Sequence, residues 1–103
     1  MRKFSFACLF GLALATAFSA PGSAADVAQG EKIAKRWCAA CHVVAQDQKQ
    51  ASVDVPTFAD AARRESDQQL SAFLVDPHPK MPDLHLSRSE IADLVAYMRT
   101  LNP

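Results

Sequence analysis

Five consecutive residues, Cys38-Ala39-Ala40-Cys41-His42, carry the side chains in this chain that are best suited to chemistry. Two cysteines separated by two residues and followed at once by histidine form the attachment signature of a c-type haem. One helical turn brings the two sulfur atoms to the same side of the backbone, where the thiols can add to the two vinyl groups of a porphyrin. The motif therefore predicts one covalently bound haem c, with Cys38 and Cys41 as attachment points and His42 as an axial ligand of the iron.

A C-x-x-C pair also occurs in thioredoxin-like proteins and in zinc sites. A thioredoxin-like site needs a βαβ pattern around the cysteines, and nothing in this sequence indicates a parallel sheet. A zinc site needs a second pair of ligands such as His78 and His85, which lie in a proline-rich stretch. Haem attachment is the better interpretation, and a thiol oxidoreductase without haem is the alternative.

The second axial ligand must come from the remaining methionine and histidine side chains or, in principle, from a lysine. The candidates are Met81, Met98, His78 and His85. Met98 falls on the apolar stripe of a predicted helix, where methionine usually packs in the core. Met81 lies in the stretch 77–82, whose three prolines prevent regular structure and hold the chain extended. We predict Met81 as the ligand, with the two histidines as alternatives.

Histidine opposite methionine raises the reduction potential of haem iron, because the soft thioether favours the ferrous state. An iron with both axial positions filled has no open site for a substrate or for oxygen. The predicted chemistry is therefore the gain and loss of one electron, without an enzymatic reaction.

The first 25 residues have the pattern of a secretory signal peptide. A positive start, Met1-Arg2-Lys3, precedes an apolar run from Phe4 to Ala20, and Ser23-Ala24-Ala25 provides small residues before a cleavage site. A single membrane anchor is the alternative, but this run is short for a bilayer span, which needs about 20 residues. The pattern predicts a periplasmic protein with no stable membrane insertion after cleavage.

Residues 26–103 are predicted to form one small domain. This segment contains nine basic and eleven acidic residues, so its net charge of −2 makes nucleic acid an improbable partner. Only two of the three cysteines lie in it, and both belong to the haem motif, which leaves no disulfide framework. A domain this small usually needs a further stabilising element, and a covalently bound porphyrin would supply one.

Capping residues and apolar periodicity predict helices in the mature domain. They run from Asp26 to about Ala40, from Thr57 to Ala62, from Ser66 to Asp76, and from Ser87 toward the end of the chain. Gly30 would cost a helix about 1 kcal/mol relative to alanine, so we interpret it as a position where another helix crosses closely. Trp37 is predicted to pack in the core beside the haem motif.

Residues 43–55 show little periodicity and are predicted to form a solvated loop. Pro56 ends this loop, and its carbonyl oxygen is the candidate acceptor for the second ring nitrogen of His42. Arg63 and Arg64 could neutralise a haem propionate, but solvated surface charge is the simpler expectation for both.

These features together resemble the monohaem class I cytochromes c, particularly the short bacterial ones. The resemblance covers the whole mature chain and rests on the glycine-bearing first helix, the C-x-x-C-H motif, the Pro56 turn, the Met81-Pro82 pair, and a final helix containing Leu94-Val95-Ala96-Tyr97. It implies an all-α cytochrome c fold, with three to four short helices around one covalent haem. It also implies that the first and last helices cross near Gly30, Leu94 and Tyr97, and that the Pro56 carbonyl accepts from His42.

The resemblance further implies a monomeric electron carrier that exchanges electrons with a donor and an acceptor redox protein through transient contacts. One alternative is a dedicated cytochrome subunit or partner of a single periplasmic dehydrogenase or oxidase. Another is a haem enzyme or gas sensor that releases Met81 to open a coordination site.

Overall fold

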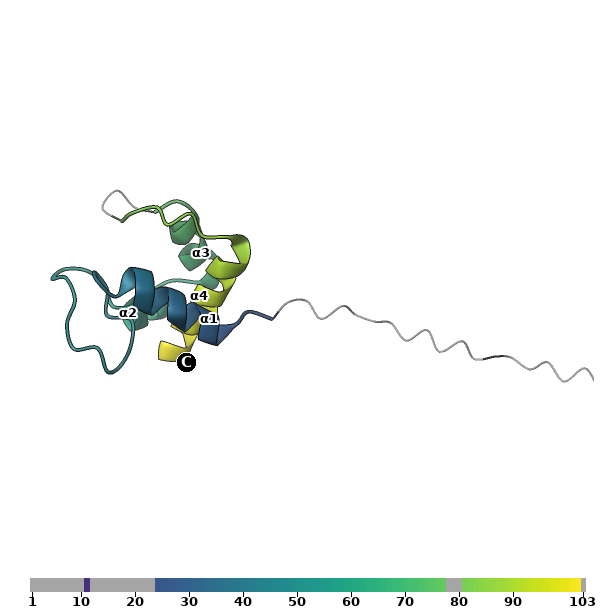
Figure 1. The fold of residues 1–103 in the computed structure, drawn as a ribbon, viewed down its shortest axis with the longest axis horizontal. Helices are drawn as coiled ribbons and strands as arrows, with labels where there is room; N and C mark the ends of the chain where they lie inside the picture. Colours follow the sequence, from purple (N-terminus) through teal and green to yellow (C-terminus); the bar gives the residue numbers. More distant parts are fainter. Residues whose placement is uncertain (1–10, 12–23, 78–80, 103) are drawn as a thin grey trace, which may run out of the picture.

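Four α-helices and one π-helical turn make up the regular structure of the part of the chain that the structure describes. Figure 1 shows how the helices are arranged. The structure is a computed structural model, and it describes residue 11, residues 24–77 and residues 81–102. The elements are α1 (Val27–Ile33), a π-helical turn (Ala34–Cys38), α2 (Phe58–Arg64), α3 (Asp67–Val75) and α4 (Arg88–Leu101). The described residues contain no strand, so the predicted all-α class is confirmed.

The predicted signal peptide, residues 1–25, lies outside the described residues except for positions 11, 24 and 25, and it remains a prediction. None of the helices in the described part of the chain combines the length and the hydrophobicity that a bilayer span requires.

Each α-helix begins at the capping residue that the sequence predicts. The side chains of Asp26, Thr57, Ser66 and Ser87 each accept a hydrogen bond from the backbone N–H three residues further on. The last two caps are reciprocal, because a glutamine or glutamate at the third helical position bonds back to the serine N–H. Local chemistry therefore fixes where the helices start.

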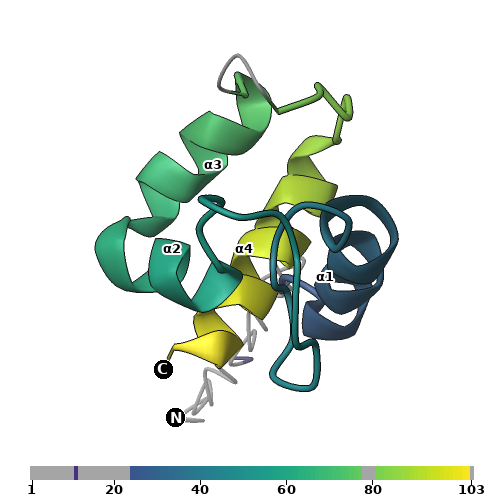
Figure 2. The ribbon, with the colours of Figure 1, turned by 90° about the vertical axis from the view of Figure 1, so that its left-hand side faces the viewer.

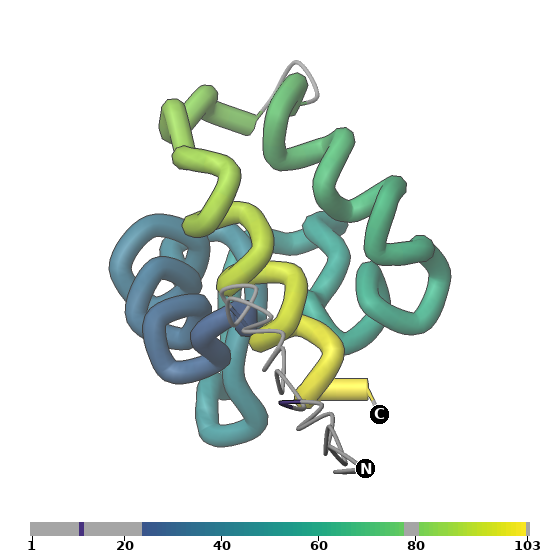
Figure 3. The backbone as a smooth tube through the Cα atoms, turned by 90° about the vertical axis from the view of Figure 1, so that its right-hand side faces the viewer, coloured from purple at the N-terminus to yellow at the C-terminus, as the bar shows by residue number. Residues whose placement is uncertain are grey.

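The α1–α4 pair has the most extensive packing in the domain. Helix α4 runs diagonally through the middle, with α1 on one side and α2 and α3 on the other (Figures 2 and 3). Gly30 of α1 is buried against α4, and a Cβ atom there would lie 2.6 Å from the carbonyl carbon of Asp93 and 2.8 Å from Cβ of Tyr97. The close crossing predicted at Gly30 is confirmed.

The first helix differs from the prediction at its C-terminal end, where the chain winds as a π-helix over Ala34–Cys38. In this segment the N–H of Ala39 bonds to the carbonyl of Ala34, five residues back. The wider turn moves the buried face by about one residue, so Cys38 is 5% exposed whereas Trp37 is 53% exposed. The prediction that Trp37 packs in the core is wrong. The indole ring of Trp37 instead lies at the surface, with the Arg36 guanidinium 4.9 Å from its centre.

Arg99 of α4 holds the junction between α2 and α3. Its guanidinium donates to the backbone carbonyls of Ala62 and Glu65, at the C-terminal end of α2, and to the carboxylate of Asp67 at the start of α3. These carbonyls lack partners within their own helix. A single side chain therefore satisfies the end of one helix and orients the beginning of the next.

Candidate functional site

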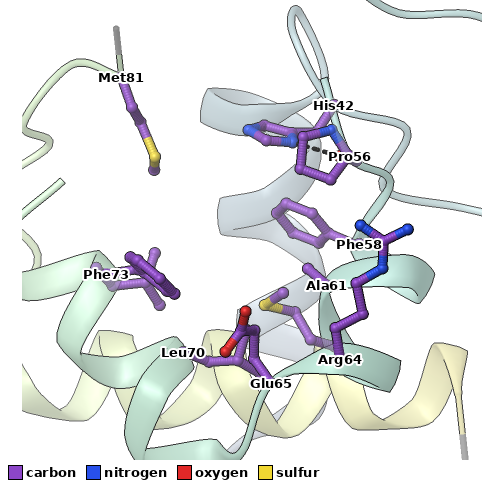
Figure 4. Close-up of a pocket in the computed structure, with 11 residues that line it drawn as sticks. His42, Pro56, Phe58, Ala61, Arg64, Glu65, Leu70, Phe73 and Met81 are labelled. Atoms are coloured by element: carbon purple, nitrogen blue, oxygen red, sulfur yellow. Dashed lines mark hydrogen bonds between the residues drawn. The ribbon is translucent and has the colours of Figure 1, made fainter. Parts of the chain in front are cut away.

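An apolar cavity of about 220 Å³ lies beside His42, between the Pro56 turn, helices α2 and α3, and the segment that begins at Met81. Packing voids in protein interiors rarely exceed the size of a water molecule, so this space is a site and not a defect of packing. Its walls are formed by His42, Pro56, Phe58, Ala61, Arg64, Glu65, Leu70, Phe73, Leu74, Met81 and Met98. Figure 4 shows this arrangement.

His42 occupies one wall, and its ring is fixed by two contacts. Its Nδ1 atom lies 2.7 Å from the carbonyl oxygen of Pro56. Because a carbonyl oxygen can only accept, Nδ1 carries a proton, and in the neutral tautomer Nε2 has the free lone pair. The ring also packs at an angle against Phe58, with 5.5 Å between the ring centres. The predicted His42–Pro56 hydrogen bond is thus present, and it leaves a nitrogen donor free for a metal.

Met81 lies on the opposite wall and points its thioether into the cavity (Figure 4). His85, an alternative ligand, points away: its side chain is 87% exposed and lies 3.7 Å from the Asp83 carboxylate. The other alternative, His78, lies outside the described residues. Met98 is buried in α4 and also lines the cavity.

The two cysteines flank the turn that leads into His42. The carbonyl of Cys38 accepts hydrogen bonds from the N–H groups of both Cys41 and His42, at 3.1 and 2.9 Å. Cys38 is buried and Cys41 is exposed, and neither side chain lines the cavity. The motif is therefore folded as one compact turn beside the cavity.

Burial raises the pKa of the Cys38 thiol to about 11, with a smaller contribution from Cys41. Reactive cysteines of thiol oxidoreductases have lowered pKa values, because the thiolate is the nucleophile. Cys38 has the opposite shift. The described residues also contain no cluster of three or more His, Cys, Asp or Glu side chains able to hold a metal ion. The raised pKa of Cys38 does not favour the thiol oxidoreductase.

Arg64 and Glu65 are the charged side chains on the cavity wall. Arg63 instead bonds Asp60 at 2.6 Å at the surface. The sequence did not distinguish the two arginines. Helical spacing explains the difference, because Phe58, Ala61 and Glu65 follow one face of α2 and Arg64 lies next to it.

Gln48 is a site residue that the sequence analysis missed. The segment 43–55 was predicted to be a solvated loop, but Val44 is only 1% exposed and Gln48 bonds the backbone around His42 through its side chain. The residues around them show no hydrophobic periodicity that could have indicated the burial of Val44 or the hydrogen bonds of Gln48. The prediction holds for the exposed residues of the segment and is wrong at these two positions.

A nitrogen donor and a thioether that face each other across an apolar cavity, directly after a C-x-x-C-H motif, form a donor set suited to haem iron in a c-type haem protein. The profile of the cytochrome c family matches residues 27–102. The chain belongs to this family. It is therefore an electron carrier with covalently bound haem c, and its fold is the all-α cytochrome c fold.

The chain is similar to cytochrome c-552 of Bradyrhizobium diazoefficiens, with 54% identity over 95 residues that cover 89% of this chain and 91% of the relative. Its fold is similar to that of cytochrome c6 from the diatom Phaeodactylum tricornutum. The TM-score is 0.53 at 26% identity, and the match covers 73% of this chain and 92% of the diatom protein.

Proposed function

We propose that the protein is a periplasmic one-electron carrier whose haem is joined to Cys38 and Cys41 and whose iron is bound by His42 and Met81. The observation that carries this proposal is the placement of His42 and Met81 on opposite walls of one apolar cavity. Haem iron supplies the reversible one-electron step when it is bound there. The residues of this chain would orient the iron ligand and keep the haem in an apolar environment.

His42 is suited to its proposed role by the Pro56 hydrogen bond. Donation from Nδ1 fixes the tautomer and the ring orientation and makes Nε2 more basic. Phe58, Leu70 and Phe73 give the cavity apolar walls, and with haem bound they would help to keep water from the iron. A haem iron with two protein ligands has no open position for a substrate, and we therefore propose that the protein is not an enzyme.

The proposed location rests on residues 1–25, which have the pattern of a signal peptide. The proposed contacts are transient ones between a monomer and its redox donor and acceptor. Arg36 and the exposed Trp37 lie directly before Cys38, and tryptophan and arginine are enriched at the energetic centres of protein interfaces. This surface is the contact region that we favour.

Replacing Arg64 by leucine should lower the midpoint reduction potential by an amount on the order of tens of millivolts. A positive charge beside the cavity disfavours the ferric state, and its removal relieves that repulsion. Arg63→Leu is the matched control and should change the potential less, because Arg63 is paired with Asp60 outside the cavity. Redox titration of both variants checks this expectation, which fails if Arg63→Leu has the larger effect.

The proposed function is tested by expressing the full chain in cells that can attach haem and export proteins. The periplasmic fraction should contain a polypeptide that begins at Asp26 and carries the mass of one haem. Its reduced-minus-oxidised spectrum should titrate as a single one-electron couple, and the reduced form should not bind carbon monoxide readily at neutral pH. Rapid carbon monoxide binding would favour the enzyme or sensor alternative, and a polypeptide without haem would contradict the proposal.

A further inference from the structure

We propose that Gln48 is a positioning residue that sets the orientation of the His42 imidazole by holding the backbone on both sides of it. The inference rests on the proposed function, in which His42 binds the iron. The side-chain oxygen of Gln48 accepts from the N–H of Val44 at 2.9 Å. Its side-chain nitrogen donates to the carbonyls of His42 at 2.9 Å and Ala39 at 3.0 Å.

These contacts lie before, at and after His42, so they restrain the whole turn that carries the ring. The regular helix has ended by Ala39, and carbonyls at a helix end have no partner within the helix. The Gln48 amide donates to the carbonyl of the helix C-cap, Ala39, and to the carbonyl of His42, and it accepts from the N–H of Val44. A hydrophobic side chain of the same size could fill the space but could not make these bonds.

Val44 connects this arrangement to the rest of the fold. It is almost completely buried, and its carbonyl accepts a hydrogen bond from the hydroxyl of Tyr97 on α4. The carbonyl of Val43 accepts from the N–H of Phe58 at 2.9 Å, which joins the same segment to the start of α2. The backbone after His42 is therefore fixed to α2 and α4, and Gln48 links the turn that carries His42 to this fixed segment.

The ring of His42 has its own restraint, the Nδ1 hydrogen bond to Pro56. That bond fixes the ring only if the His42 backbone stays in place. When the Gln48 contacts are lost, the backbone at His42 can move and the imidazole plane can rotate about the Pro56 contact. Gln48 thus acts through His42 and does not itself line the cavity.

The test uses the mature holoprotein with Gln48→Met, which preserves the side-chain length and removes the hydrogen bonds. Gln46→Met is the matched control, because Gln46 is exposed in the same segment. In Gln48→Met the Val44 amide should exchange its hydrogen about tenfold faster, since it loses its acceptor. The NMR shifts of the haem methyl groups in the ferric protein, which report the orientation of the axial imidazole, should be redistributed. Gln46→Met should match the wild type in both measurements.

Gln48→Glu is a second variant that keeps the acceptor for Val44 but removes the donors to Ala39 and His42. We expect near-normal Val44 exchange together with altered haem methyl shifts. The proposal is overturned if both Gln48 variants keep the wild-type methyl shifts, even where amide exchange rises throughout the protein, because Gln48 would then have only a general structural role. A wild-type protein without haem, or without resonances of an iron-bound histidine, would instead contradict the proposed function.

Discussion

Replacing Met81 by alanine is expected to lower the midpoint reduction potential by a few tenths of a volt, while the haem stays attached. Axial ligands set haem potentials over a range of about 0.8 V. A thioether stabilises the ferrous state, and the variant exchanges it for water or another harder donor. Cys38, Cys41 and His42 are unchanged in this variant, so attachment should persist. Redox titration and an intact mass of the same sample measure both effects.

His85→Ala is the control for this prediction. The His85 side chain is exposed and directed toward Asp83, so its removal should leave the potential within a few hundredths of a volt of the wild type. An unchanged potential in Met81→Ala would show that another group occupies the second axial position. A large change of potential in His85→Ala would identify that histidine as the group.

Replacing Gly30 by alanine is expected to destabilise the mature domain by about 3 kcal/mol or more. In an exposed helix this change would be stabilising by about 0.5–1 kcal/mol, because alanine is the better helix former. Here the new Cβ would lie 2.6 Å from the backbone of Asp93. Backbone cannot rotate out of the way, so α1 and α4 must separate, and their packing is the most extensive in the domain. Denaturant unfolding of the holoprotein measures the loss.

Ala28→Leu is the control for Gly30→Ala, because Ala28 is an exposed position of α1. Added volume there should change the free energy of unfolding by less than about 0.5 kcal/mol. If Gly30→Ala were as stable as the wild type, the two helices would not cross as closely as the structure has them.

The helical framework could be predicted because its signals are local. Side-chain caps such as Ser66 and Ser87 satisfy N–H groups within their own first turn, so a short stretch of sequence is enough to place a helix start. Gly30 was informative for a related reason. A glycine lowers the stability of a helix relative to alanine, and a close helix crossing, which leaves no room for a Cβ atom, explains why glycine occurs there.

The π-helical turn before the haem motif could not be predicted in this way. An α-helical pattern through Ile33, Ala34 and Trp37 places all three on one face. The chain inserts a wider turn instead, and it buries Cys38 in place of Trp37. Which of these two residues is buried depends on packing against the rest of the domain, and neighbouring residues carry no signal for it.

In the candidate site, too, the residues with a local sequence signal could be predicted and those that depend on the fold could not. His42 and Met81 could be proposed as donors because few residue types suit a haem iron and the prolines around Met81 exclude helix. Of two other residues at the site, Gln48 was not singled out, and Arg64 was named only together with Arg63 and expected to be solvated surface charge. Their roles depend on which backbone groups and which cavity wall the fold brings near them, and polar side chains of their kind are usually solvated.

The central claim, that the iron is held by one imidazole nitrogen and one thioether, is tested most directly by the iron X-ray absorption spectrum of the mature ferric protein. The account predicts one sulfur and five nitrogen neighbours, with the sulfur contribution lost in Met81→Ala. A wild-type spectrum with only nitrogen or oxygen neighbours, or a sulfur contribution that persists in Met81→Ala, would contradict it.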